Sequence, residues 1–479
     1  MKISKKFGLQ RSQYELDFVD IDVTKDTPLF LDPYFISKME FPFAEDAYRT
    51  LKNFFDYLLA LLRANRLGEA KEIFSYLGET NEICLGLSKG RPSGKGMGPS
   101  DANKIFDSLI QSKAYETGLM EDIEDFRIFV PNVDKDKVSD MTANIIKRHL
   151  IRYTQEQCKL WGIPLTQSVP SGYFWDRDSR QWNNQYTEML VVEGKRVILV
   201  PKRIVSYSKE YTDKKFLQHF VLNYLQDEHL RLNSSLVRER KDKTKYVTKK
   251  DVRQYEEARS GIDKKWLADF TLEHPDIFAA FKKETINRIS TVENSELDDI
   301  NIVDVVEYLI TRLKSIPAGN EHASAYHRTV VGIMELLFYP NLGNPQIEKE
   351  IHEGRKRIDI TFDNSAESGF FYRLGSDIPC RFVMVECKNY SRDIANPELD
   401  QLSGRFSPRR GQLGISACRV IEDKDLFIKR CVDTWKDDRG LIIPLTDEDF
   451  FQMLREYPDK GILAGEDFLQ NKYREIAMG

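Results

Sequence analysis

Three side chains with the chemistry of a metal site lie in two short segments of the last third of the chain. Asp359 belongs to RIDITF, and Glu386 and Lys388 belong to RFVMVECK. Strand alternation places Asp359 on the face opposite Ile358 and Ile360, and places Glu386 and Lys388 together on one face. Two neighbouring carboxylates repel each other unless a cation enters, and hard oxygen ligands suit Mg²⁺ or Mn²⁺ better than Zn²⁺. The pattern therefore predicts a divalent-metal site between two adjacent strands.

A metal ion at such a site would activate water against a phosphodiester. It polarises a phosphoryl oxygen and lowers the pKa of bound water, so that a nucleophile forms at neutral pH. Lys388 would be placed to orient or deprotonate that water and to stabilise the developing negative charge. These residue types thus predict phosphodiester hydrolysis.

The elements on either side of these strands add further candidates. ASAYHRTVVGIMELLF predicts a helix in which Glu335 interrupts an apolar run. A carboxylate there is costly unless it faces a metal, a water-filled cleft or a basic partner, or unless it lies on an exposed side. PELDQLSGRF predicts a second helix, carrying Gln401. In the RFSPRR that follows, Arg405, Arg409 and Arg410 are candidates for bidentate phosphate contacts, with surface charge or internal pairing as the alternative.

RIDI followed by VMVECKNY resembles the PD-(D/E)xK, or restriction-endonuclease-like, nuclease superfamily over about residues 322–421. The resemblance implies an αβββαβ core with Asp359, Glu386 and Lys388 at the three motif positions. The Pro of the family name is absent. Residues 364–380 lengthen the connection between the second and third strands, as a substrate-contacting loop or as decoration.

The same resemblance implies roles for three further groups. Glu335 matches the additional carboxylate of many members, and so becomes an ancillary metal ligand. Gln401 lies where some lineages carry a Gln near the metal. The backbone carbonyl of Cys387 would be a metal ligand, while its side chain, on the face opposite Glu386 and Lys388, is expected in the core.

Length and charge limit the remaining possibilities. With 479 residues the chain exceeds one usual core, so two or three domains are expected. Its 71 basic and 76 acidic residues give a net charge of −5, so any nucleic-acid contact must use local basic patches. The six cysteines form no C-x-x-C pair, and the sequence shows neither a signal peptide nor a membrane-spanning run. We therefore expect a cytoplasmic protein with no membrane partner.

The expected fold class is mixed α/β with several domains. A helix-rich α+β region over 1–165 precedes a small region with a β-hairpin and a basic segment over 166–260. A helical connector over 261–320 leads to the nuclease domain over 321–479, where Pro317 suggests the boundary.

Local patterns place several elements of the first 200 residues. Apolar residues over 51–62 predict a helix with one buried face, and a second helix is expected from about Asp140 through Tyr153. TEMLVV and RVILVP predict a hairpin that turns at Glu193 and Gly194.

Two segments could contact nucleic acid but have simpler interpretations. Residues 238–253 carry eight basic and three acidic residues, typical of a solvated face, and Thr248 with Asp251 predicts a helix start there. The Gly-rich loop over 85–101 lacks the spacing of a P-loop and reads as a connector.

The resulting hypothesis is a Mg²⁺- or Mn²⁺-dependent nuclease. DNA is favoured because the family resemblance is to restriction, repair and resolvase enzymes. The large companion region resembles that of restriction or anti-phage defence nucleases, which implies a homo-oligomer. Since the chain has no ATPase motif, translocation, if the reaction needs it, must come from a partner ATPase or defence-system subunit. The competing hypothesis is a nucleic-acid-binding or scaffold subunit whose nuclease fold is inactive or partner-activated.

Other polar residues are weaker candidates. His322 and His327 show no metal-ligand spacing and are expected as caps or surface residues. A third hypothesis places the activity at four carboxylates in the first third of the chain, which are more typical of caps and turns. These are Asp20, Asp22, Asp32 and Asp140.

Overall fold

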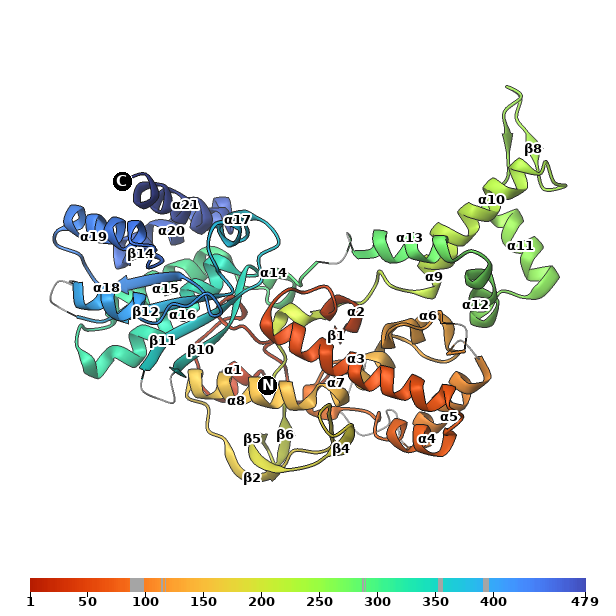
Figure 1. The fold of residues 1–479 in the computed structure, drawn as a ribbon, viewed down its shortest axis with the longest axis horizontal. Helices are drawn as coiled ribbons and strands as arrows, with labels where there is room; N and C mark the ends of the chain where they lie inside the picture. The colour runs from red at the N-terminus through yellow and green to blue at the C-terminus, as the bar shows by residue number, and fades with distance from the viewer. Residues whose placement is uncertain are drawn as a thin grey trace.

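The computed structural model describes residues 1–86, 99–112, 115–116, 118–286, 288, 290–351, 356–390 and 396–479. The protein is mixed α/β and mainly helical, with a five-stranded sheet in its last third. Figure 1 shows an elongated molecule, with the sheet at one end, the N-terminal region in the middle and a slender arm at the other end. In the described part of the chain, no helix combines the length and apolar character needed to span a bilayer. Most of the predicted Gly-rich loop, residues 87–98, lies outside the described residues.

The N-terminal region, residues 1–212, is built mainly from helices. These are α1 Ile3–Lys6, α2 Pro33–Ile36, α3 Pro42–Arg63, α4 Leu67–Phe74, α5 Pro99–Ser112, α6 Phe126–Phe129, α7 Lys135–Ile145 and α8 Lys147–Trp161. The apolar stripe predicted over 51–62 is buried in α3. The second predicted helix is instead two, because the backbone at Ile146 (φ −91°, ψ 11°) leaves helical geometry between α7 and α8. Its predicted apolar side chains are buried all the same.

The predicted hairpin forms with the predicted turn, but its second strand is shorter than RVILVP predicts, because it ends at Val197. β5 (Tyr186–Val192) and β6 (Lys195–Val197) pair antiparallel, with Leu190 opposite Val197. Glu193 and Gly194 between them both have positive φ, 50° and 76°, which suits a two-residue turn that follows the strand twist. β2 (Thr166–Pro170) pairs with the other edge of β5.

The arm carries the predicted basic segment at its tip (Figure 1). It consists of α10 Leu222–Arg231, β8 Arg238–Glu239, β9 Lys245–Tyr246 and α11 Lys249–Ser260. β8 and β9 form a short antiparallel hairpin. The hydroxyl of Thr248 accepts a hydrogen bond from Asp251 N at 3.1 Å, so α11 begins where the sequence predicts. The chain returns through α12 Lys264–Glu273, α13 Pro275–Ile286 and α15 Ile302–Ser315.

The sheet has strand order β10-β11-β12-β13-β14. Its strands are β10 Leu342–Ile351, β11 Lys356–Asn364, β12 Phe382–Lys388, β13 Leu413–Cys418 and β14 Leu441–Thr446. β10, β11 and β12 pair antiparallel, whereas β12, β13 and β14 pair parallel. β13 and β14 are buried along their whole length, as expected for parallel strands covered on both faces. The sequence analysis did not predict β14.

Helices cover the sheet and fix the residues at its end. α16 (Ala323–Phe338) contacts β10, β11 and β12, and α18 (Asn396–Ser403) contacts β13 and β14. Gly414 of β13 lets α18 approach closely, because a Cβ there would lie 2.8 Å from Leu402 Cδ2. The insertion over 364–380 forms α17 (Gly369–Asp377), which packs against α21 (Leu463–Met478). The remaining helices at this end are α19 Lys424–Lys436 and α20 Asp447–Lys460.

Candidate active site

Asp359 and Glu386 face each other across neighbouring strands. In the antiparallel pair of β11 and β12, Ile360 lies opposite Val385. One further step of the same register puts Asp359 opposite Glu386, with both side chains on one face. The backbone N–H of Cys387 donates to Asp359 Oδ2 at 3.0 Å, which fixes the Asp359 carboxylate beside β12. The structure thus brings together the two carboxylates predicted from the sequence.

The Glu386 carboxylate is buried and is held by two cations. Lys388 Nζ donates to Glu386 Oε1 at 2.7 Å, and Arg405 forms an ion pair with Oε2. Lys388 also donates to Gln401 Oε1 at 3.2 Å. Gln401 therefore reaches the site from α18, where the sequence places it.

The three arginines after α18 do not form one phosphate-binding patch. Arg405 is 4% exposed and contacts Glu386 rather than solvent. Burial lowers the pKa of Arg405, while the charge of Asp359 opposes that shift. Arg410 donates from Nε and Nη2 to the Arg405 carbonyl, at 3.2 and 3.0 Å. Arg409 is exposed, so it alone of the three presents its side chain openly to solvent.

The structure does not bring Glu335 to the metal site, so its prediction as an ancillary ligand is wrong. Glu335 is fully buried, and burial, together with the charge of Asp17, raises its pKa well above the usual value. The charges of Lys202 and Arg203 act in the opposite direction. Glu335 therefore lies within the influence of two basic side chains, although neither of its carboxylate oxygens has a hydrogen-bond partner. Among the described residues, no group of three or more Asp, Glu, His or Cys side chains is arranged to hold a metal.

His327 of α16 lies near the site, whereas the sequence analysis expected it as a cap or surface residue. Burial lowers its pKa, while the charge of Asp359 and a hydrogen bond to the Cys387 backbone raise it. His327 and Glu335 are eight residues apart on the same helix stripe, or about 12 Å along the axis. Their shared stripe was the sequence signal that either residue could face the site. Only the docking of the helix decides which of the two reaches the strand ends.

Mg²⁺ or Mn²⁺ fits the residues present. Asp359 and Glu386 offer hard oxygen atoms, and Mg²⁺ in proteins commonly takes one or two carboxylates while keeping water and substrate phosphate as its other ligands. Glu386 already attracts the positive charges of Lys388 and Arg405 in a buried setting. The ion would be held by these two carboxylates, with the Cys387 carbonyl as a further candidate ligand. The Cys387 thiol is buried, which raises its pKa well above the usual value and makes a thiolate unfavourable.

The four N-terminal carboxylates have hydrogen-bond partners of their own. Asp32 caps α2 by accepting from Phe35 N, and Asp20 accepts from the backbone and hydroxyl of Ser4. Asp22 accepts from Thr24, and Asp140 from Thr80 N. Asp32 is thus a cap and Asp22 a turn former, while Asp20 and Asp140 bind segments distant in the sequence, and these separate contacts disfavour the third hypothesis.

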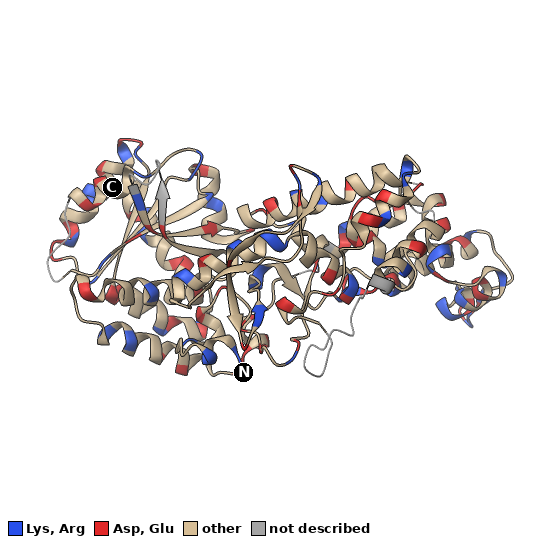
Figure 2. Ribbon diagram, turned by 90° about the horizontal axis from the view of Figure 1, so that it is seen from below, with Lys and Arg blue, Asp and Glu red and all other residues tan. Residues whose placement is uncertain are grey.

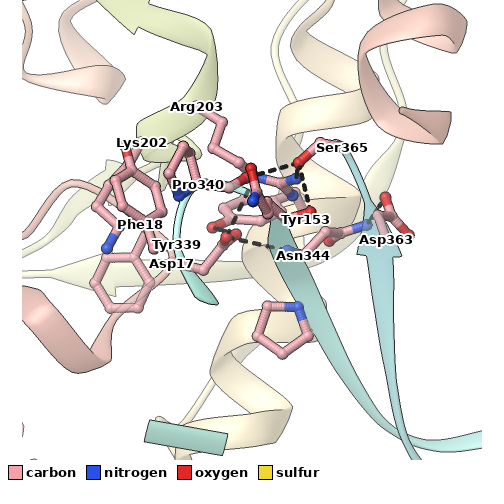
Figure 3. A network of polar contacts seen from close by, with 12 residues as sticks. Asp17, Phe18, Tyr153, Lys202, Arg203, Tyr339, Pro340, Asn344, Asp363 and Ser365 are labelled. Atoms are coloured by element: carbon pink, nitrogen blue, oxygen red, sulfur yellow. Dashed lines mark hydrogen bonds and ion pairs between the residues drawn. The ribbon is translucent and has the colours of Figure 1, made fainter. Parts of the chain in front are cut away.

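A buried polar network joins the N-terminal region to the sheet (Figure 3). Asp17 accepts from Tyr153 Oη at 2.6 Å and from Asn344 N at 3.0 Å. The amide of Asn344 donates to Asp363 Oδ2 at 2.9 Å. Arg203 is fully buried, and donates to Ser365 Oγ at 2.6 Å. We call these residues, with Lys202 and Glu335, the interregion network.

Arg203 crosses β10 at a glycine. A Cβ at Gly343 would lie 2.4 Å from Arg203 Cζ, so a larger residue would displace the guanidinium. The Nε of Arg203 lies 3.8 Å from Asp17 Oδ1, and its guanidinium stacks over Phe41, 4.2 Å from the ring centroid. The N-terminal region thus places a positive charge deep against the sheet.

Asp363 should make stability depend on pH. Burial raises the pKa of Asp363 to about 6, from 3.8. A carboxyl whose pKa is higher in the folded state stabilises the fold when protonated, so this contribution is present below about pH 4 and is lost as pH rises to about 6. We expect Asp363→Asn to flatten that part of the curve of unfolding free energy against pH, measured by urea denaturation. Exposed Asp459→Asn is the matched control, and an unchanged slope in Asp363→Asn would contradict the assignment.

The comparisons with known proteins concern mainly the N-terminal region. A family model described as "Domain of unknown function (DUF8370)" matches residues 8–212. No curated protein and no solved structure matches the chain. The matched segment contributes Asp17, Tyr153, Lys202 and Arg203 to the interregion network, and it ends before the sheet that carries Asp359 and Glu386.

Proposed function

We propose that the protein is a metal-dependent nuclease that hydrolyses phosphodiester bonds of nucleic acid, with DNA as the favoured substrate. The observation that carries this proposal is the opposition of Asp359 and Glu386 across β11 and β12, with Lys388 beside Glu386. Apart from α17, inserted between β11 and β12, the order α16, β10, β11, β12, α18, β13 supports it, because it follows the αβββαβ order that the family resemblance implies. The preference for DNA rests on that resemblance.

The chemistry would be divided among a few side chains. Mg²⁺, when bound, supplies Lewis-acid polarisation of a phosphoryl oxygen and a bound water of lowered pKa. Asp359 and Glu386 would hold it. Lys388, fixed between Glu386 and Gln401, is placed to orient the attacking water and to offset the charge that develops on phosphate. Water adds to phosphorus, the bond to the leaving oxygen breaks, and that oxygen takes up a proton.

The tip of the arm gathers several Lys and Arg residues, which supports a nucleic-acid partner (Figure 2). The basic hairpin, residues 238–246, has five Lys or Arg and two acidic residues. Its basic side chains are exposed. Because the whole chain is acidic, such a local cluster is what phosphate contact requires. We propose that the hairpin contacts the nucleic-acid backbone away from the cut.

Loss of charge from the basic hairpin should weaken binding in a salt-dependent way. We expect the double variant Lys241→Gln/Lys243→Gln to bind DNA less tightly, and to reduce the slope of log affinity against log salt by about 1 to 2. Fluorescence anisotropy at several salt concentrations measures this slope. Lys424→Gln/Lys429→Gln, on exposed positions of α19, is the matched control. A slope equal to wild type in the hairpin variant would remove the hairpin from the interface.

One observation favours the competing hypothesis of a dormant nuclease fold. Both Glu386 oxygens are engaged, by Lys388 and Arg405, so a metal ion would have to compete with the Arg405 guanidinium. Incubation with supercoiled, linear and single-stranded DNA and with RNA, in Mg²⁺, Mn²⁺ or EDTA, separates the two hypotheses. Cleavage that needs the metal supports the nuclease. Binding without cleavage of any substrate supports the dormant or partner-activated form.

A further inference from the structure

A pocket lies between the N-terminal region and the sheet, and the proposed reaction does not account for it. Its volume is about 490 Å³, within the range of small-ligand sites. One wall comes from α3 and α8, and includes Phe43 and Arg152; the other comes from the sheet, and includes Thr361, Phe382 and Met384. We call it the interregion pocket.

The interregion pocket opens on the sheet face that carries the two carboxylates. Thr361 lies opposite Met384 in the pairing of β11 and β12. Asp359 and Glu386 are two residues further along their strands, so they share that face about 7 Å away. A strand whose phosphate lay between Asp359 and Glu386 would therefore have a neighbouring nucleotide at the pocket.

The walls suit the flat face of a base. Phe43 makes an edge contact with Tyr153, at 5.8 Å between ring centroids. At this wall Phe43 is half-buried and Tyr153 is buried. Phe382 is half-buried on the opposite wall. Aromatic rings of this kind stack on unpaired bases with little regard to their identity. The Thr361 hydroxyl and the Glu156 carboxylate line the same pocket and can meet the polar edge of a base.

The rim suits phosphate. Glu45 is already paired with Arg381 at 2.7 Å, and Asp46 with Arg177 at 2.6 Å, so these two carboxylates are neutralised. Arg152 is exposed, and it has no ion-pair partner among the described residues. The rim therefore leaves a guanidinium for a phosphate group.

We propose that the interregion pocket is a nucleotide subsite that takes one unpaired base of the substrate strand next to the scissile phosphate. This deepens the proposed nuclease function and rests on it. The Arg381–Glu45 pair joins the two walls at the rim, and the volume accommodates one nucleotide rather than stacked base pairs. A base must therefore leave a duplex to enter, which costs least in single strands, mismatches, bubbles and ends. The enzyme should cut such unpaired sites in preference to intact duplex.

The first test measures binding without cleavage. In EDTA, the full chain is titrated into single-stranded oligonucleotides with 2-aminopurine at successive positions. We expect a fluorescence change at one position, about tenfold weaker binding in Phe43→Ala, and recovery in Phe43→Tyr. Tyr186→Ala, on a side chain 77% exposed on β5, is the control. Arg152→Ala, an exposed change that spares the fold, should also weaken binding.

The second test compares substrates. In Mg²⁺, wild type should cut a duplex with a bubble at least tenfold faster than the same sequence fully paired, and Phe43→Ala should lose most of that preference. Cleavage by a Phe43→Ala enzyme with an unchanged preference would overturn the subsite and leave the nuclease standing. Phe43-dependent fluorescence without any cleavage would support the subsite and count against the nuclease. Free mononucleotides form a further arm, and their binding as tightly as the strand would overturn the assignment to substrate.

Discussion

Asp359→Ala and Lys388→Ala should each abolish most metal-dependent cleavage, with a fall in rate of about 10²- to 10⁴-fold. Asp359→Ala removes one of the two carboxylates that would hold the metal. Lys388→Ala removes the ammonium beside Glu386 that would orient the attacking water. The rate is measured on the preferred substrate as initial velocity over a Mg²⁺ titration. High Mg²⁺ should restore part of the activity of Asp359→Ala but none of that of Lys388→Ala.

The controls distinguish lost chemistry from a lost fold. Lys429→Ala and Asp425→Ala change exposed residues of α19 and should cleave as wild type does. Asp359 is half-buried and accepts a hydrogen bond from the Cys387 N–H, so its variant should keep the thermal midpoint and the affinity for DNA in EDTA. Undiminished cleavage by Asp359→Ala or Lys388→Ala, or cleavage by the wild type in EDTA, would reject the site.

Arg203→Met should destabilise the whole protein by about 3–5 kcal/mol. Met keeps much of the volume but removes the charge that lies near Asp17 and Glu335 and the hydrogen bond to Ser365. Asp17 would then be buried without its ion-pair partner, and Glu335 would keep Lys202 as its basic neighbour. Chemical denaturation monitored by tryptophan fluorescence measures the loss, and exposed Arg231→Met is the control. A loss below about 1 kcal/mol would show that the guanidinium is not needed where the structure places it.

Strand alternation was enough to predict the centre of the candidate site. The alternating side chains around Asp359 and Glu386 assign both residues to one face, and the pairing of β11 with β12 then sets them opposite each other. The same local information predicted the buried face of α3 and the turn at Glu193 and Gly194, because each depends on neighbours in the sequence.

The other features of the candidate site and of the interregion network depend on how segments distant in the sequence pack together. His327 and Glu335 lie on one helix stripe, so the sequence could not say which of them reaches the strand ends. For Arg405 the sequence left phosphate contact, surface charge and internal pairing open, because nothing local indicates that it folds back onto Glu386. Asp17 contacts Asn344, and Arg203 contacts Ser365, only in the folded chain. Each pair is more than a hundred residues apart in the sequence, and no sequence periodicity predicts such contacts.

The interregion network also bears on how this protein could be dissected or exchanged. A gene fragment that begins near Pro317 would contain every proposed catalytic residue, yet it would lack Asp17, Lys202 and Arg203. Glu335 and Asp363, both buried, would then lose basic charges that act on them, and the Tyr339 hydroxyl would lose the Val292 carbonyl to which it donates. The sheet region is therefore not expected to fold without the first 212 residues. A recombination event that separated the two regions would leave neither with a complete hydrophobic and polar interior.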